Sequence, residues 1–410
     1  MLDVNFIREN LDLVKEKILS KRVDSKILDR FVELDGNWRE MREQMDKLRA
    51  ELNTHSKERN IEAAKAVKAG IRKIEDNLSG TEKERAEFLS QLPNLPKDGW
   101  LVGRGEEDNK VIRTVGEKPR FDFEVKDYMN LSERLGLIDT ERAAQVSGSR
   151  FGYLFREAAL LELALIQFAF SHLVKKGFIP VFPPVMIKPD VYRGMGRLQG
   201  GQEEERYYLQ NDDLYLVGSS EHTIGPIHKD EIFKPEDLPR RYVGFSTCFR
   251  REAGSYGKDT KGILRVHQFD KVEMFSFTKP EDSEGEHQFL LAAQEELISA
   301  LGLHYRVVQV CTGDMGFTDM AQYDIETWLP GQDKYRETNS CSNTGDFQAR
   351  GIGVKYKADK KAEFVHMLNA TGYAIGRILI AIIENYQTPD GDIVIPPVLR
   401  PYLGMDKISR

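Results

Sequence analysis

Residues 245–277 read FSTCFRREAGSYGKDTKGILRVHQFDKVEMFSF, and the fold can be worked out from this stretch. Two apolar runs flank a charged connection with Gly254, Gly257 and Gly262, a pattern that predicts a long antiparallel β-hairpin. Side chains two residues apart in a strand lie on the same face. The first strand should therefore place Arg250 and Glu252 on one face. The return strand should carry a second row, namely Arg265, His267, Phe269, Lys271 and Glu273.

So much charge on one sheet face needs an explanation, because a buried charge is costly unless it is paired or meets a ligand. One interpretation is a solvated face with surface ion pairs. The other is a site for a polyanion, since the arginine side chain matches phosphate and carboxylate geometry. Composition alone leaves both interpretations open.

The residues of this stretch carry a family resemblance. Phe249-Arg250-x-Glu252, followed by a glycine-rich loop and by HQFDKVE at 267–273, resembles motif 2 of class II aminoacyl-tRNA synthetases. The form of the motif is similar to that of the seryl-tRNA synthetases. The rest of the chain can be compared with that family motif by motif.

Length and composition indicate a folded protein of two or three domains, with 410 residues of which 40% are hydrophobic. A net charge of −7 argues against a protein that coats nucleic acid nonspecifically, although a local basic patch can still bind RNA. The three cysteines, Cys248, Cys311 and Cys341, have no metal-binding spacing, so we expect reduced thiols and no structural zinc.

The location is expected to be cytoplasmic. The first residues, MLDVNFIRENLD, fit neither a signal peptide nor a transit peptide. No later stretch looks long and apolar enough to span a bilayer, so no membrane partner is expected.

The N-terminal third predicts helices. The first twenty or so residues suggest one short helix with Leu11, Val14 and Ile18 on one side. A heptad pattern follows at Ile27, Phe31, Leu34, Trp38, Met41, Met45, Leu48 and Leu52. A second run extends from Val67 to Leu92, with polar Thr81 and Arg85 at seam positions. Together they predict an antiparallel two-helix coiled-coil arm at about 27–92, within an N-terminal domain of residues 1–100.

The arm has two interpretations. A solvated dimerisation arm is the plainer one. In the seryl-tRNA synthetases, however, such an N-terminal arm grips the long variable arm of tRNA(Ser). The resemblance therefore implies tRNA binding, and the connection between the two helices is mildly basic.

The remaining motifs follow in the family's order. Residues 101–120 resemble its linker, and 121–410 its catalytic domain. A helix at 157–175 precedes residues 176–186, which resemble motif 1 with Pro184 as its signature proline. That motif lies at the dimer interface in the family, so a homodimer is implied. Residues 368–384 resemble motif 3, in which LNATGYAIGR opens an apolar helix whose early Arg377 needs a partner.

Two positions depart from the family pattern. Ser219 and Glu221 stand where the family carries Thr-x-Glu, so Ser219 keeps the hydroxyl and loses a methyl group. The stretches ETNSCSN (337–343) and DFQAR (346–350) are similar to a signature of the seryl enzymes, but Gly351 follows where an arginine is usual.

The resemblance implies an α+β fold, in which a class II catalytic domain on an antiparallel β-sheet flanked by helices follows the coiled-coil arm. It also implies the reaction. L-serine is activated with ATP to seryl-adenylate and passed to the 3′ end of tRNA(Ser), with tRNA(Sec) as a further expected acceptor.

Residue roles carry over from the family by position. Arg250 would hold the α-phosphate and the serine carboxylate, and Glu252 would read the adenine amine. Phe269 and Arg377 would sandwich the adenine ring, and Arg265 would lie by the outer phosphates. Arg250, Glu252 and Arg377 are the expected catalytic residues.

The metal and the amino acid have expected ligands as well. Glu337 and Ser340 would hold Mg²⁺ beside the ATP phosphates. The residues expected to bind serine are Ser219, Glu221, Arg250, Asn369, Glu273 and Thr371.

Two other classes of protein stay possible at this point. A paralogue could activate an amino acid for an acceptor other than tRNA, although it would have little use for the arm. A noncatalytic coiled-coil scaffold should have lost the charged motif residues, which are present here.

Overall fold

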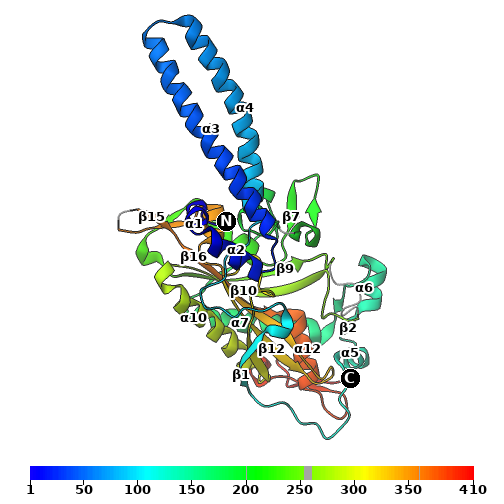
Figure 1. Cartoon of the computed structure of the whole chain (residues 1–410). Coiled ribbons are helices and arrows are strands. Elements are labelled where there is room, and N and C mark those ends of the chain that lie inside the picture. Colours follow the sequence, from blue (N-terminus) through cyan, green and yellow to red (C-terminus); the bar gives the residue numbers. More distant parts are fainter. Residues whose placement is uncertain (200, 254–260, 360) are drawn as a thin grey trace. The chain divides into compact units, whose positions relative to one another are not determined.

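The computed structural model describes residues 1–199, 201–253, 261–359 and 361–410. These form two compact units, Met1–Leu95 and Pro96–Arg410 (Figure 1). The N-terminal unit contains the helices α1 (Val4–Glu9), α2 (Leu11–Ser20), α3 (Ser25–Lys57) and α4 (Ile61–Ser90). Asp3, Asp24 and Asn60 begin α1, α3 and α4 by accepting hydrogen bonds from backbone N–H groups of the first turn.

The antiparallel arm predicted from the heptad pattern is confirmed by α3 and α4, which lie side by side (Figure 1). Phe31, Met45 and Leu78 are among the residues buried along it. The prediction of a single short helix before the arm was wrong. Asn10 leaves the helical conformation at φ −133° and ψ 41° and separates α1 from α2, and Leu11 is exposed.

A buried ion-pair group lies in the N-terminal unit. Asp35 is 4% exposed and accepts hydrogen bonds from Arg8 (Nε to Oδ2, 2.7 Å) and Arg85 (Nε to Oδ1, 2.7 Å). Burial by itself would raise the pKa of Asp35, but the two guanidinium groups lower it below its usual value. Arg85, a polar residue at a seam position of α4, is thus paired with Asp35 of α3.

The C-terminal unit is built on an eight-stranded sheet with the order β1-β11-β12-β13-β16-β10-β9-β4. Neighbouring strands are antiparallel except β4 and β9, which are parallel. The strands are β1 (Lys110–Val115), β4 (Ile179–Val181), β9 (Arg240–Phe249), β10 (Gln268–Thr278), β11 (Tyr305–Gln309), β12 (Ala321–Leu329), β13 (Lys334–Asn343) and β16 (His366–Ala374).

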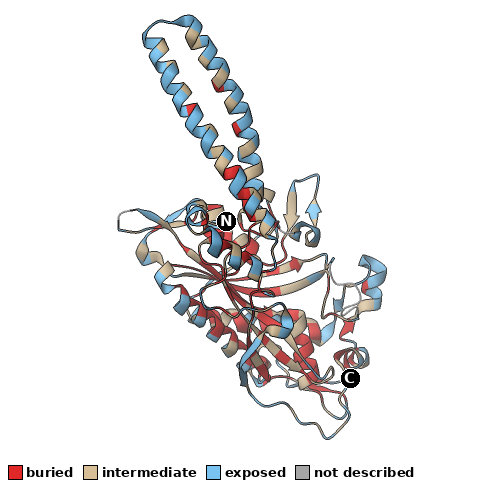
Figure 2. Ribbon diagram, viewed as in Figure 1, coloured by how far each residue is buried: buried red, intermediate tan, exposed pale blue. Residues whose placement is uncertain are grey.

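The helices α7 (Arg156–Lys175), α10 (Ser283–Ala300) and α12 (Ile375–Asn385) pack against this sheet. Their apolar side chains join those of the strands in one large core, and Figure 2 shows buried residues concentrated in the sheet and the helices beside it. The other helices are α5 (Tyr128–Leu135), α6 (Thr140–Ser147), α8 (Pro189–Gly194), α9 (Glu221–Ile224), α11 (Phe347–Ile352) and α13 (Arg400–Leu403).

Short strands complete the connections. They pair in four small sheets, formed by β2 (Ile138–Asp139) with β3 (Tyr153–Leu154), β5 (Met186–Ile187) with β7 (Leu214–Leu216) and β6 (Tyr208–Leu209), β15 (Ala362–Phe364) with β14 (Lys355–Lys357) and β8 (Ile232–Phe233), and β17 (Ile393–Val394) with β18 (Lys407–Ile408).

Among the residues that the structure describes, α7 is the one helix long and apolar enough to cross a bilayer by length and composition. The expectation that no stretch would reach this limit was wrong. Seven residues of α7, Leu165 and Phe168 among them, are buried within the C-terminal unit. Its apolar composition therefore serves core packing in this fold.

The predicted hairpin is confirmed as β9 and β10, which pair from Phe249 opposite Gln268 to Arg240 opposite Phe277. Arg250, Glu252, Arg265 and His267 lie beyond the paired strands, so the alternation expected for them was wrong. Glu252 has φ 50°, which ends the extended conformation. Gly254 and Gly257 lie outside the described residues.

Gly262 is required where it stands. Its φ is 75°, and a Cβ there would lie 1.7 Å from the Tyr128 hydroxyl oxygen. The Tyr128 hydroxyl in turn accepts a hydrogen bond from the Ile263 N–H at 3.0 Å. This close approach fixes the position of Gly262 and Ile263 in the connection between β9 and β10.

Motif 3 is a strand followed by a helix. The sequence predicted that residues 368–377 open a helix, but residues up to Ala374 form β16, which pairs with β10 and β13 in the middle of the sheet. The helix α12 begins at Ile375. Tertiary pairing thus overrides the local apolar pattern.

The glycine that replaces the family's arginine lies at a tight helix contact. A Cβ on Gly351 would be 1.9 Å from the backbone oxygen of Gly194, where α11 packs on α8. This contact leaves no room for an arginine unless the two helices separate.

The last residues of α12 anchor two loops. Glu384 is fully buried and accepts hydrogen bonds from the backbone N–H groups of Tyr128 (3.2 Å) and Gly331 (2.9 Å). Burial raises the pKa of Glu384 to about 7, even though these hydrogen bonds lower it.

The raised pKa predicts a pH-dependent stability. The folded carboxyl keeps its proton up to about pH 7 and the unfolded one loses it from about pH 4.5, so the free energy of unfolding should fall as pH rises through this window. In Glu384→Gln this fall should be smaller by up to about 3 kcal/mol, measured by urea unfolding at several pH values. The exposed Glu281→Gln is the control, and identical pH slopes in all three proteins would contradict the prediction.

Candidate active site

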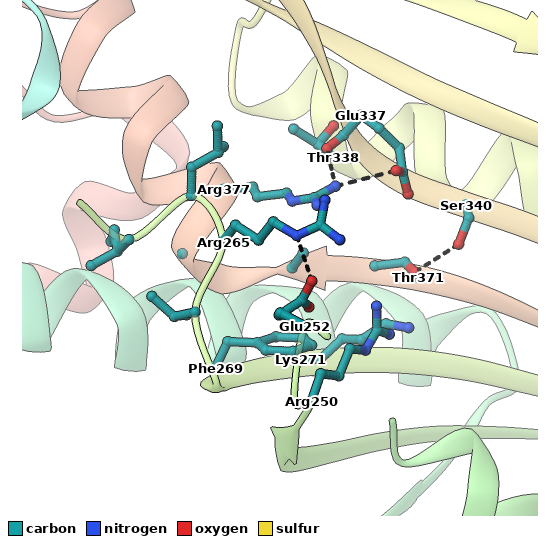
Figure 3. Close-up of a pocket in the computed structure, with 15 residues that line it drawn as sticks. Arg250, Glu252, Arg265, Phe269, Lys271, Glu337, Thr338, Ser340, Thr371 and Arg377 are labelled. Carbon is teal, nitrogen blue, oxygen red and sulfur yellow. Dashed lines mark hydrogen bonds and ion pairs between the residues drawn. The ribbon is translucent and has the colours of Figure 1, made fainter. Parts of the chain in front are cut away.

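One pocket of the C-terminal unit brings together most of the predicted site residues (Figure 3). Because β13, β16, β10 and β9 are consecutive in the sheet, segments far apart in the sequence meet there. The predicted residues that line it are Arg250, Glu252, Arg265, Phe269, Glu337, Ser340, Thr371 and Arg377.

The β9–β10 connection forms one side of this pocket. The Nε of Arg250 donates to the Gly218 carbonyl oxygen at 3.2 Å, and its guanidinium carbon lies 5.1 Å from the ring centroid of Phe269, a cation–π contact. Glu252 and Arg265 form an ion pair. The pocket therefore has an aromatic surface and two guanidinium groups within reach of it.

Arg377 has the partner that its place in an apolar helix requires. Its Nη1 donates to the Glu337 backbone oxygen at 2.7 Å and lies 3.3 Å from Glu337 Oε2 (Figure 3). The start of α12 is thereby tied to β13, and the guanidinium lines the same pocket as Phe269.

An acidic group lies on the neighbouring strand. Asp324 on β12 is directly opposite Ser340 on β13. Burial and the nearby Glu337 raise the pKa of Asp324 well above its usual range. Asp324 belongs to none of the motifs recognised in the sequence, because its position beside Ser340 depends on strand register, which the sequence of one strand does not reveal.

These oxygen donors fit a divalent cation. Two carboxylates and a hydroxyl are hard ligands of the kind that Mg²⁺ uses together with phosphate oxygens. Burial and the nearby Glu337 both raise the pKa of Asp324, and a cation between the two carboxyl groups would favour their ionised forms. The described residues contain no group of three or more His, Cys, Asp or Glu placed to hold a metal alone. A metal here would need further ligands from a nucleotide.

A second cavity continues from the first and shares Arg250, Glu252, Arg265, Lys271 and Ser340 with it. Its further lining includes predicted serine-binding residues, namely Ser219, Glu221 and Asn369. The side-chain nitrogen of Asn369 is buried and has no hydrogen-bond partner among the described residues.

Glu273 lies in the sheet beside this second cavity and is 1% exposed. Its Oε2 is 2.6 Å from Lys271 Nζ, and the same ammonium lies 3.3 Å from the Ser219 hydroxyl. Burial raises the pKa of Glu273, whereas Lys271 lowers it. The sequence analysis placed Lys271 on the polar row but did not count it as a site residue.

Glu221 has partners of its own. It forms an ion pair with Arg197 and accepts a hydrogen bond from Gln348 at 3.3 Å, and these contacts hold its pKa below the usual value despite burial. Glu221 therefore fixes Arg197 in the cavity wall.

A buried histidine of the second cavity has several cationic neighbours. His222 is buried there and accepts hydrogen bonds from the Tyr192 hydroxyl (2.9 Å) and the Gly218 N–H (3.2 Å). Burial and the neighbouring cations, of which Arg206 is the first, lower the pKa of His222 well below its usual value. The sequence analysis missed Arg206, since it lies in no recognised motif.

Known proteins share both units of this structure. Residues 1–96 match the family model of the seryl-tRNA synthetase N-terminal domain, and residues 206–386 match that of the tRNA synthetase class II core domain (G, H, P, S and T). The serine–tRNA ligase of Syntrophobacter fumaroxidans is 42% identical over 419 residues, which cover 98% of this chain and 99% of that protein.

Solved structures agree with this similarity. Seryl-tRNA synthetase from Pyrococcus horikoshii, complexed with ATP, has a TM-score of 0.94 and 38% identity, covering 100% of this chain and 99% of that one. Cytoplasmic serine–tRNA ligase from Naegleria fowleri, in complex with AMP, has a TM-score of 0.90 and 34% identity, covering 100% of this chain and 99% of that one. This chain therefore belongs to the seryl-tRNA synthetases, a family of class II aminoacyl-tRNA synthetases.

Proposed function

We propose that this chain is a serine–tRNA ligase that uses ATP. The carboxylate of L-serine attacks the α-phosphorus of ATP, which forms seryl-adenylate and releases pyrophosphate. The terminal ribose hydroxyl of tRNA(Ser) then attacks the carbonyl carbon of seryl-adenylate, which forms the ester bond and releases AMP. The observation that carries the proposal is that Arg250 lines both cavities, so one guanidinium can reach the carboxylate and the phosphate that must react.

In this proposal the first pocket binds the nucleotide. The adenine ring lies between Phe269 and Arg377, and Glu252 accepts a hydrogen bond from its amine. Arg265 lies by the outer phosphates, and Arg250 stabilises charge that develops on the α-phosphate. Such a reaction needs no covalent enzyme intermediate, because positioning and charge neutralisation supply the rate.

Glu337 and Ser340 would hold Mg²⁺ together with phosphate oxygens in this proposal, and Asp324 lies on the neighbouring strand opposite Ser340. Bound there, the cation would neutralise the phosphates and orient them. The support from this chain is the set of oxygen donors.

In this proposal serine binds in the second cavity, next to its border with the first pocket, where Thr371 lies. Glu273, Thr371 and Ser219 take the amino and hydroxyl groups, Asn369 offers its unpartnered amide, and Arg250 takes the carboxylate. Glu221 contributes through Arg197, which it holds in the cavity wall.

The N-terminal domain, taken as residues 1–100, binds tRNA in this proposal, and residues 101–120 link it to the catalytic domain of 121–410. The support is the long exposed arm of α3 and α4, whose connecting end carries Lys57, Arg59 and Lys65. tRNA(Sec) as a second acceptor and the cytoplasmic location stay predictions.

We also propose a homodimer through motif 1. Large apolar side chains of the motif are exposed, with Phe182 at 73%, Met186 at 45% and Ile179 at 41%, and Leu163 of the preceding helix α7 is 63% exposed. Exposed apolar side chains that gather in one patch mark an interaction site, and the proposal places these residues in such a patch.

The function is tested by pyrophosphate exchange with ATP and serine, threonine, cysteine or alanine, followed by charging of tRNA(Ser). We expect exchange with serine and charging of the tRNA. Exchange without charging would favour a paralogue with another acceptor. No exchange by the folded protein would favour a scaffold and refute the proposal.

The serine pocket gives a second prediction. Thr371 is 3% exposed and its hydroxyl lies 3.4 Å from that of Ser340, so Thr371→Val removes a buried hydroxyl with little change of shape. We expect the KM for serine to rise about tenfold, because a buried hydrogen bond is lost, while the Kd for ATP stays within about twofold. Equal losses for serine and ATP would contradict this role.

The dimer gives a third prediction. Phe182→Glu places a charge on the exposed apolar surface, so the protein should become monomeric in sedimentation analysis and lose charging activity. The control is Val102→Glu, which places a charge at another exposed apolar position (71%) outside motif 1. A Phe182→Glu protein that stays dimeric would exclude this interface.

A further inference from the structure

Two arginine side chains converge over Gly218 in the second cavity. Arg206 follows the short 3₁₀ helix η2 (Gln202–Glu205), and Arg250 follows β9. A Cβ on Gly218 would lie 2.9 Å from Arg206 Nη1 and 3.5 Å from Arg250 Cγ. The absence of a side chain at Gly218 therefore leaves the space that the Arg206 guanidinium occupies.

The other cations of this cavity are paired with carboxylates. The pairs are Arg197 with Glu221, Arg265 with Glu252, and Lys271 with Glu273. Among the described residues, neither Arg206 nor Arg250 has a carboxylate within ion-pair distance. The Nε of Arg206 is also buried without a hydrogen-bond partner in the described part of the chain.

This arrangement places two guanidinium groups side by side, and no carboxylate of the described residues forms an ion pair with either of them. Burial lowers the pKa of Arg206, and the nearby Arg250 and Arg197 lower it further. Burial, and after it the same cations, lower the pKa of the neighbouring His222 as well. A buried charge of this kind is costly unless a ligand supplies the opposite charge.

The lining of the two cavities indicates which anion is expected. Arg250 lines both cavities, whereas Arg206 lines the second cavity, with Ser219 and Asn369, and is not part of the lining described for the nucleotide pocket. A carboxylate of an amino acid bound in the second cavity would therefore lie closer to Arg206 than a phosphate of a nucleotide bound in the first pocket.

We propose that Arg206 is a further substrate-binding residue, whose guanidinium binds the carboxylate of L-serine together with Arg250. This inference rests on the proposed function. Arginine suits the role because its planar fork can donate two parallel hydrogen bonds to one carboxylate. Two guanidinium groups together would fix the orientation of the carboxylate that attacks.

Arg206→Met tests this proposal, with Arg206→Lys as the conservative variant and Arg193→Met as the matched control. Arg193 has a side chain that is 52% exposed and lines neither cavity. In pyrophosphate exchange, Arg206→Met should raise the KM for serine about 10- to 100-fold and leave the KM for ATP within about twofold. Arg206→Lys should recover part of this loss, and Arg193→Met should match the unchanged protein.

A competitor without the carboxylate separates binding from packing. L-serinamide should compete with serine more weakly than L-serine analogues that keep the carboxylate, and Arg206→Met should reduce that preference. Arg206 also lies 5.7 Å from the Tyr192 ring, so a purely structural role is the alternative. A structural role would lower activity or stability without changing the preference for the carboxylate.

Gly218→Ala provides a second, independent test, because it displaces the Arg206 guanidinium without removing its charge. It should raise the KM for serine in the unchanged protein and have a smaller effect in the Arg206→Met background. Additive effects of the two substitutions would contradict the proposal.

Other outcomes overturn the assignment in distinct ways. An equal rise in the KM for ATP would assign the anion to a nucleotide phosphate, and a rise confined to the KM for tRNA would assign it to the tRNA 3′ end. No change would leave Arg206 a packing residue. Failure of the unchanged protein to exchange with serine would instead refute the proposed function.

Discussion

The placement of β10 between β9 and β16 is the constraint on which the rest of the C-terminal unit depends. It carries Lys271 and Glu273 into the interior, where they are 7% and 1% exposed. Neither charge would be tolerated alone, so the two are paired at 2.6 Å. The neighbouring strands supply the other polar residues of the cavity. The strand pairing that buries this ion pair therefore also sets the geometry of the site.

The charges of the cavities divide into two classes. Carboxylate partners hold Arg197, Arg265 and Arg377 in place, so these side chains are positioned before any ligand arrives. Arg206 and Arg250 lack carboxylate partners among the described residues, although the Nε of Arg250 donates to the Gly218 carbonyl oxygen. Guanidinium groups that carboxylates hold in place do not have to be reoriented during the reaction, and for this reason positioning alone can supply much of the rate.

The sequence indicated the arm, the hairpin and the motif residues, because each depends on a local pattern. It did not indicate that Arg250 and Arg265 lie outside the paired strands, since the left-handed φ of Glu252 is a local conformation that alternation cannot reveal. Nor did it indicate Asp324, whose place beside Ser340 is set by strand register.

The residues assigned to serine in the proposed function explain how a small polar amino acid would be distinguished. Glu273, Asn369 and Thr371 are all at most 5% exposed, so their polar groups have little access to water. An amino acid without the serine hydroxyl would leave such groups unpaired, and an unpaired buried group costs more than a made hydrogen bond gains. Alanine would then be rejected by lost hydrogen bonds. Threonine would have to be rejected by lack of space, and the close packing of Ser340 and Thr371 at 3.4 Å restricts that space.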